Sequence, residues 1–457
     1  DKILAVGDGV QVPEGSVVHD LAGRHLWPAL IDPYSDLGMV SAEKEEPQER
    51  GAHYWNPAIR ASRSAAQRYK PEDERIAKLR EQGFGLVLTH RMDGIARGTG
   101  ALVLLAGRNE EQDMLVPAAS AHFSFRKGSS NDPYPSSLMG SIALLRQALY
   151  DARWYSTGSA AQTDVDLQAL NEQAALPWVF ETSARHDPAR IAALGREFGR
   201  SFIVKGRGDE YQHLEETVAA GTSLILPLTL PDASDVEDPF EALEVSLEQL
   251  KHWELAPHDP RMLAAAGVQF AFTTNGLKEP SELWSALHRM VRCGLDSSIA
   301  IAAFTTIPSE LFGVSQRCGT IEAGKLASFI VSSGHLLDEK NVIQETWVAG
   351  QRFTIKPPDG SDLRGEYDLN LRDRILRLQV KGGSAKPEFH LYDPKVDSIK
   401  VKADVTRQAE LISIAFDGSR LNIQGHVRLN GIIHAKGGIW DGQGQLPGGA
   451  WIGWTAV

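Results

Sequence analysis

Four polar side chains follow apolar runs that have the composition of buried strands: Asp36, Glu181, Lys205 and Asn275. In a barrel of parallel strands, the carboxyl ends of the strands meet at one mouth, and active sites are built there. Two carboxylates beside a lysine could hold a metal ion or act as an acid/base pair. Alternatively, Lys205 and Glu181 neutralise each other in a vestigial pocket, because a buried charge needs a partner.

Several histidines could supply an imidazole to such a site. His90 directly follows an apolar run, so its side chain is placed to project into a barrel mouth. His186 and His258 each precede an Asp-Pro pair, which is typical of a helix start. His213 and His252 fall within expected helices. We therefore expect the last four to be structural or solvent-facing and take His90 as the first to examine.

Two further features suggest binding rather than catalysis. Residues 205–209, with the sequence Lys-Gly-Arg-Gly-Asp, form a glycine turn after a strand that could bind an anion through backbone N–H groups. The turn lacks the full glycine fingerprint of a nucleotide site. Trp440, Trp451 and Trp454 could form a sugar-stacking surface, although aromatic residues in a β-domain also serve as core anchors.

The elements that must position these residues change in type along the chain. Residues 1–27 read as short strands with tight turns, and 41–75 as a long polar loop with helical pieces. From 76 to 313, helices alternate with short apolar strands, which predicts a TIM-like (β/α)8 barrel. A linker is expected at 357–361, and residues 362–457 alternate as in an antiparallel β-sandwich or open barrel.

Composition excludes several functional classes. The 457 residues carry a formal net charge of −12, which provides no basic face for nucleic acid. No apolar run reaches the roughly 18–20 residues that span a bilayer. The two cysteines, Cys293 and Cys318, are expected to be free thiols. Because the chain starts with Asp1, we expect the native start upstream, and a periplasmic or secreted location is favoured with the cytoplasm left open.

Three phrases carry a family resemblance: GRHLWPALID at 23–32, AAFTTIPSELFGV at 302–314 and GTIEAGKLASFIV at 319–331. Together they resemble the amidohydrolase superfamily in its imidazolonepropionase-like branch. The resemblance implies a composite β-sandwich and a barrel, and the predicted C-terminal β-domain lies outside the usual family core. The corresponding boundaries are 1–27 plus 314–356 for the sandwich, 28–313 for the barrel and 362–457 for the β-domain.

The resemblance also implies a metal centre that this sequence departs from. Members of the family hold one or two divalent metals, often Zn²⁺, which lower the pKa of a bound water. The family's His-x-His pair, two further histidines and an aspartate match Tyr34, Asp36, Glu181, Lys205 and Asn275 here. We therefore expect the standard site to be lost and no cofactor in this chain. The fallback metal set is Asp36, Glu181 and His90.

The resemblance suggests a role beside an active enzyme. The chain looks like the degenerate N-terminal half of a tandem amidohydrolase with its connecting β-domain. We expect a structural or regulatory half that pairs with an active C–N bond hydrolase half, covalently or as a separate chain, in an oligomer. The alternatives are a metal-dependent amide, cyclic amide or peptide hydrolase with an unusual site, and a ligand- or carbohydrate-binding module.

Overall fold

The computed structural model describes most of the chain in two compact units. The described residues are 1–39, 51–356, 363–372, 374–383, 386–394, 396–408, 410–434 and 439–457. The first part of the expected polar loop and the expected linker at 357–361 lie outside these residues. The two units are 1–356 and 357–457. Within the described residues, no helix is long and apolar enough to cross a membrane.

The first unit is built around an eight-stranded sheet whose strands follow one another in chain order. The strands are β2 (Leu30–Ser35), β3 (Phe84–Thr89), β4 (Ala96–Leu104), β5 (Met114–Ser124), β6 (Trp178–Glu181), β7 (Phe202–Lys205), β8 (Leu224–Pro227) and β9 (Phe270–Thr273). Only β4 runs antiparallel to its neighbours, and the other pairings in this sheet are parallel. β3 is buried along its whole length, as a strand covered on both faces should be. The expected TIM-like barrel is confirmed.

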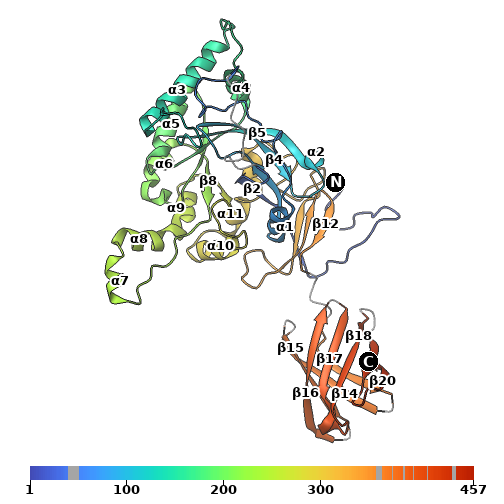
Figure 1. The fold of residues 1–457 in the computed structure, drawn as a ribbon. Helices are drawn as coiled ribbons and strands as arrows, with labels where there is room; N and C mark the ends of the chain where they lie inside the picture. Colours follow the sequence, from blue (N-terminus) through green and yellow to red (C-terminus); the bar gives the residue numbers. More distant parts are fainter. Residues whose placement is uncertain are drawn as a thin grey trace. The chain divides into compact units, whose positions relative to one another are not determined.

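Helices surround this sheet (Figure 1). They are α1 (Asp73–Glu81), α2 (Glu110–Asp113), α3 (Leu138–Tyr155), α4 (Val165–Glu172), α5 (Asp187–Phe198), α6 (Leu214–Ala220), α7 (Pro239–Glu244), α8 (Leu247–Leu255), α9 (Asp259–Ala265), α10 (Glu282–Arg292), α11 (Ser297–Ala302) and α12 (Thr306–Leu311). The pattern at 240–251 predicts one helix, but the structure has two. Ser246 and Gln249 form a capping box that starts α8 and so ends the first helix.

The seam between β9 and β2 is closed without a strand ladder among the described residues. Two backbone carbonyls after α11 bond to the two strands instead. The Phe304 carbonyl accepts from the Ile31 N–H of β2 at 2.8 Å, and the Ala303 carbonyl accepts from the Phe272 N–H of β9 at 3.0 Å. The Asp32 carboxylate of β2 also joins the two strands directly, because it accepts a hydrogen bond from the Thr273 hydroxyl of β9 at 2.6 Å. Side-chain bonds and one helix end therefore complete the barrel.

A small antiparallel sheet accompanies the barrel in the first unit. Its order is β1 (His25–Pro28), β10 (Phe329–Ser332), β11 (Ile343–Val348) and β12 (Gln351–Thr354). The strands expected between residues 3 and 24 are absent there. Only Lys2 makes a bridge, to Leu326, while Leu4 and Val17 are 84% and 80% exposed. These residues have strand-like composition but no partner strand.

The second unit is a closed antiparallel barrel. Its strands are β13 (Gly365–Leu371), β14 (Arg374–Gly383), β15 (Lys386–Asp393), β16 (Val396–Gln408), β17 (Leu411–Asp417), β18 (His426–Ile433), β19 (Trp440–Gln445) and β20 (Trp451–Ala456). Alternate residues point into its core, as on β20, where Ile452 and Trp454 are buried and Trp451 is exposed. The expected antiparallel β-domain is confirmed as a closed barrel.

Candidate functional site

A buried arginine sits among the residues at the mouth of the first barrel. Arg97, on β4, is 3% exposed. Its guanidinium donates to the Tyr34 hydroxyl at 3.1 Å and to the Glu181 carboxylate at 2.6 Å. It also donates to the Gly94 carbonyl. One cation therefore joins the ends of β2 and β6, at two positions that the family resemblance assigns to metal ligands.

The electrostatics of this cluster follow from burial and from Arg97. Burial raises the pKa of the Tyr34 hydroxyl, which stays a neutral phenol. Burial also opposes ionisation of Glu181, but Arg97, with help from Lys205 and Arg126, holds the pKa of that carboxyl below its ordinary value. Glu181 is therefore a carboxylate that is already paired.

Lys205 lies beside this pair at the end of β7. Burial lowers the pKa of its ammonium group, and Glu181 and Glu210 oppose that shift. Its Nζ lies 5.8 Å from the centroid of the Tyr34 ring. The expected neutralisation of Lys205 by Glu181 is partial, since the short hydrogen bond of Glu181 goes to Arg97.

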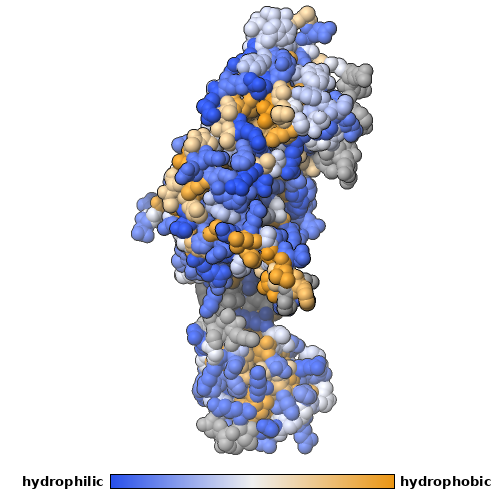
Figure 2. Space-filling view, turned by 90° about the vertical axis from the view of Figure 1, so that its left-hand side faces the viewer, coloured by the Kyte–Doolittle hydropathy of each residue, from blue (hydrophilic) through white to orange (hydrophobic). Residues whose placement is uncertain are grey.

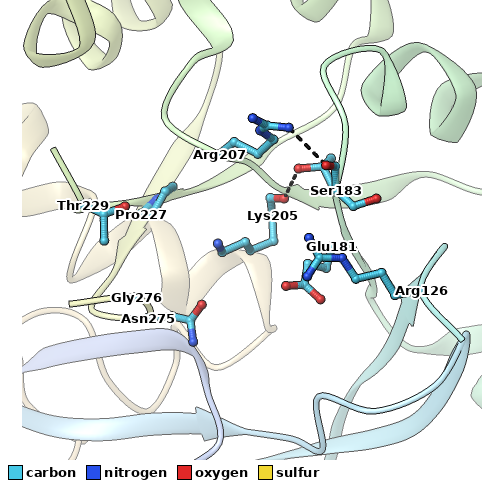
Figure 3. A pocket seen from close by; sticks show the side chains of 10 residues that line it. Arg126, Glu181, Ser183, Lys205, Arg207, Pro227, Thr229, Asn275 and Gly276 are labelled. Atoms are coloured by element: carbon cyan, nitrogen blue, oxygen red, sulfur yellow. Dashed lines mark hydrogen bonds between the residues drawn. The ribbon is translucent and has the colours of Figure 1, made fainter. Parts of the chain in front are cut away.

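A cavity of about 380 Å³ opens over these residues. Figure 3 shows Lys205, Glu181, Arg126 and Asn275 arranged around it. Its complete lining is Arg126, Glu181, Thr182, Ser183, Lys205, Arg207, Pro227, Thr229, Asn275 and Gly276. Three side chains are cationic and one is anionic, so the cavity is positively charged and polar.

Asp36 does not join this group. Its carboxylate pairs with Arg75 at 2.7 Å, and its side chain is 54% exposed. It lines a separate cavity of about 270 Å³. The fallback metal set of Asp36, Glu181 and His90 is therefore not brought together by the structure. Asp36 comes just after the end of β2, and its carboxylate is held at the surface by Arg75.

His90, directly after β3, is buried in a cluster of aromatic rings that includes Tyr34. It stacks on His122 with ring centroids 3.6 Å apart and meets Tyr34 edge-on at 4.4 Å. His122 bonds to the Ser120 hydroxyl at 2.7 Å. Neither ring nitrogen of His90 has a hydrogen-bond partner among the described residues. Burial lowers the pKa of both imidazoles, and Arg97 adds to the shift.

Because both histidines have lowered pKa values, we predict that the folded protein loses stability in acid. In the folded state their pKa values lie well below 6.5, whereas an unfolded histidine titrates near 6.5. Below about pH 6.5 the unfolded chain gains protons that the folded chain does not, so the free energy of unfolding falls. The slope of that free energy against pH is proportional to the number of protons taken up on unfolding. We expect His90→Gln to reduce this number by up to about one between pH 6 and 5.

Urea unfolding at pH 7.5, 6 and 5 measures this slope. The matched control is His25→Gln, which removes an exposed imidazole from β1. Equal slopes for the parent chain and His90→Gln would show that His90 does not carry the acid sensitivity.

Two backbone N–H groups of the glycine turn at 205–209 are bonded to a carboxylate of the same chain segment. The carboxylate of Glu210 accepts the backbone N–H groups of Arg207 at 2.7 Å and Gly208 at 2.9 Å. A Cβ on Gly206 would lie 2.2 Å from the same carboxylate. These amides are already occupied, which agrees with an ordinary βα loop and not with the minor alternative of an anion site. The turn instead fixes the backbone that presents the Lys205 and Arg207 side chains.

One group of three metal-capable side chains occurs among the described residues. His186, His213 and Glu216 have ligand atoms within 4.8 Å of one another. They lie in the segments after β6 and β7, displaced from the strand ends. Arg185 donates to the His213 Nε2, so that nitrogen is engaged. The sequence prediction treats these histidines singly and does not anticipate their convergence.

The tryptophans of the second unit do not form one surface. Trp440 is fully buried, Trp454 is 2% exposed and its indole donates to the Asn430 carbonyl, and Trp451 is 65% exposed. The alternative of a three-tryptophan sugar surface is therefore not supported, and Trp440 and Trp454 are core anchors, as the favoured interpretation expects. Cys293 and Cys318 are free thiols, as expected, and burial raises the pKa of Cys318 to about 11.

The residues at the mouth do not fit the family's divalent metal. Tyr34 is a neutral phenol bonded to a guanidinium, and Glu181 is paired with the same group. Asn275 is a weak ligand that contacts the sulfur of Met92. A cation that is part of the chain would repel a metal ion at this point.

Comparisons with known proteins agree with the fold. The sequence model described as "Amidohydrolase family" matches residues 256–353. An amidohydrolase from Thermotoga maritima MSB8 is 19% identical with a TM-score of 0.63, over 77% of this chain and 93% of its own. No curated protein sequence matches the chain.

Two further solved structures are more distant. A prolidase complexed with N-methylphosphonate-L-proline is 17% identical with a TM-score of 0.44, over 77% of this chain and 92% of its own. An adenine deaminase is 14% identical with a TM-score of 0.41, over 77% and 93%. The amidohydrolase resemblance is confirmed over residues 256–353, and the Thermotoga protein shares the fold of the first unit. The interpretation as one half of a tandem protein stays a prediction.

Proposed function

We propose that this chain is a non-catalytic amidohydrolase-type domain with a structural or regulatory role beside an active C–N bond hydrolase half. The observation that carries the proposal is the place of Arg97. A guanidinium bonded to both Tyr34 and Glu181 supplies, from within the chain, the positive charge that the family obtains from a metal ion. The cluster is neutralised without a Lewis acid, and no water is activated there.

The pairing part of the proposal is supported by an exposed apolar face on α7 and α8. These helices project from the first unit (Figure 1). Phe240, Leu243 and Leu247 are 79%, 81% and 67% exposed. Figure 2 shows apolar side chains gathered over this region. An apolar patch rimmed by charged residues is typical of a protein interaction site, and Glu244 and Glu248 lie beside this one.

The test is the metal content of the purified full chain after dialysis without chelator. We expect less than about 0.1 equivalent of transition metal at the barrel mouth. His213→Ala is measured in parallel because it removes the outer His186, His213 and Glu216 group. One equivalent that survives in His213→Ala and disappears in Glu181→Gln would contradict the proposal.

The pairing is tested separately through α7 and α8. We expect a chelator-sensitive amidase activity to co-purify with the parent chain and to be lost with Leu243→Glu plus Leu247→Glu. The matched control is Met139→Glu, at a 79% exposed position on α3. Retention of the activity by the double variant would place the partner elsewhere.

A metal-dependent hydrolase with an unusual site is the second candidate. The observation that favours it is the convergence of His186, His213 and Glu216, since catalytic zinc sites use three protein ligands and one open position. This candidate predicts about one equivalent of metal that His213→Ala removes together with any hydrolase activity. The same measurement therefore separates the two candidates.

A further inference from the structure

We propose that the cavity at the barrel mouth binds a small organic anion, carrying a carboxylate or phosphate group, on the side chains of Lys205, Arg126 and Arg207. The inference rests on the proposed absence of a metal there, since a metal would bring its own ligands into the same space. It extends that proposal by naming the chemistry that the cavity recognises.

The first argument is the charge balance of the lining. Lys205, Arg126 and Arg207 face the cavity, and Glu181 is its one lining carboxylate (Figure 3). Glu181 is already bonded to the buried Arg97 at 2.6 Å. Arg207 is paired with Asp209 at 3.4 Å, whereas Lys205 and Arg126 form no ion pair among the described residues. Lys205 and Arg126 are therefore the cations that a bound anion would neutralise, with Arg207 as a shared partner.

The second argument is the environment of Lys205. Among the described residues, no ion pair joins a carboxylate to its ammonium group, although the residue is half-buried at the end of β7. A cation removed from water is stabilised by an anion that it can contact. A bound carboxylate or phosphate would supply that contact and would meet Arg207 on the same segment of chain.

The third argument is the way the cations are held. The backbone around Arg207 is fixed because Glu210 accepts its N–H at 2.7 Å. One guanidinium nitrogen of Arg207 also donates to the Ser183 carbonyl at 3.1 Å. A preordered cation loses less conformational entropy when a ligand binds.

The size and polarity of the cavity limit the ligand. A volume of about 380 Å³ is at the small end of ligand sites. The lining gains further polar groups from Thr182, Ser183, Thr229 and Asn275, and its apolar side chain is that of Pro227. A small polar anion fits this lining, whereas an aliphatic chain would find little apolar surface.

Isothermal titration calorimetry with inorganic phosphate and with malonate tests the proposal at constant ionic strength. The full chain is first stripped with EDTA and dialysed into metal-free, chelator-free buffer, and its metal content is measured on the same sample. We expect saturable binding of at least one probe, weakened about tenfold or more by Lys205→Met and several-fold by Arg207→Gln. Lys340→Met, at an exposed loop position, should change it by less than about twofold.

The outcomes separate the two proposals. Binding of phosphate alone or of malonate alone supports the site and identifies which anion it takes. No binding of either probe, or equal binding by the parent chain and both cavity variants, overturns it. If binding requires added Zn²⁺ and the chain retains that metal, the cationic site and the metal-free function both fail. If the chain holds metal but stripped protein still binds, only the proposed function fails.

Discussion

Replacing Arg97 with methionine is expected to destabilise the first unit by about 3–5 kcal/mol, the cost of removing one partner from a buried ion pair. Arg97 is 3% exposed and bonds to Glu181 at 2.6 Å, so the variant leaves a half-buried carboxylate without the cation that is hydrogen-bonded to it. Chemical denaturation followed by circular dichroism measures the loss.

A control variant and a double variant test whether the loss of stability comes from the buried ion pair. Arg146→Met breaks an exposed pair with Glu197 on the helical surface, and we expect a much smaller effect. Arg97→Met combined with Glu181→Gln should recover part of the lost stability, because the unpaired charge is then gone. An Arg97→Met variant as stable as Arg146→Met would mean that the guanidinium does not hold the mouth together.

Truncating Trp440 to alanine is expected to cost the second unit about 3–5 kcal/mol, as for other large aromatic side chains deleted from a core. Trp440 is fully buried inside the closed barrel and packs on Tyr367 with ring centroids 4.5 Å apart. Trp451→Ala, at a 65% exposed position, should change stability by about 0.5 kcal/mol or less.

Scanning calorimetry should show where each loss falls. The two units have separate hydrophobic cores, so we expect Trp440→Ala to lower one transition and Arg97→Met the other. A single transition that both variants shift equally would show that the units unfold together.

Much of the barrel follows from the sequence because short apolar strands alternate with amphipathic helices. β7 and β9, at Phe202–Lys205 and Phe270–Thr273, are among the short apolar runs between 76 and 313 from which the barrel is predicted. β5, at Met114–Ser124, escapes prediction because its alanines, serines and Pro117 do not resemble a strand. His122 lies on that strand, so its stacking with His90 escapes as well.

The centre of the site could not be predicted for a related reason. Glu181, Lys205 and Asn275 follow recognisable strands and do line one cavity. Arg97 precedes the portion of β4 that has strand-like composition, and nothing in its spacing points to Glu181, 84 positions away. Its place depends on β4 running antiparallel between β3 and β5, which is a property of the tertiary fold.

The seam between β9 and β2 has a consequence for motion. Strands joined by a ladder separate only when many backbone bonds break together, whereas this junction depends on a few bonds around Asp32 and two carbonyls after α11. The seam is therefore the natural starting point for local unfolding, and its amides should exchange with solvent sooner than those of β3. If the seam opened, the edges of β2 and β9 would be exposed and could pair with a strand of another chain. By holding the seam closed, the Asp32 carboxylate therefore also protects the protein against aggregation.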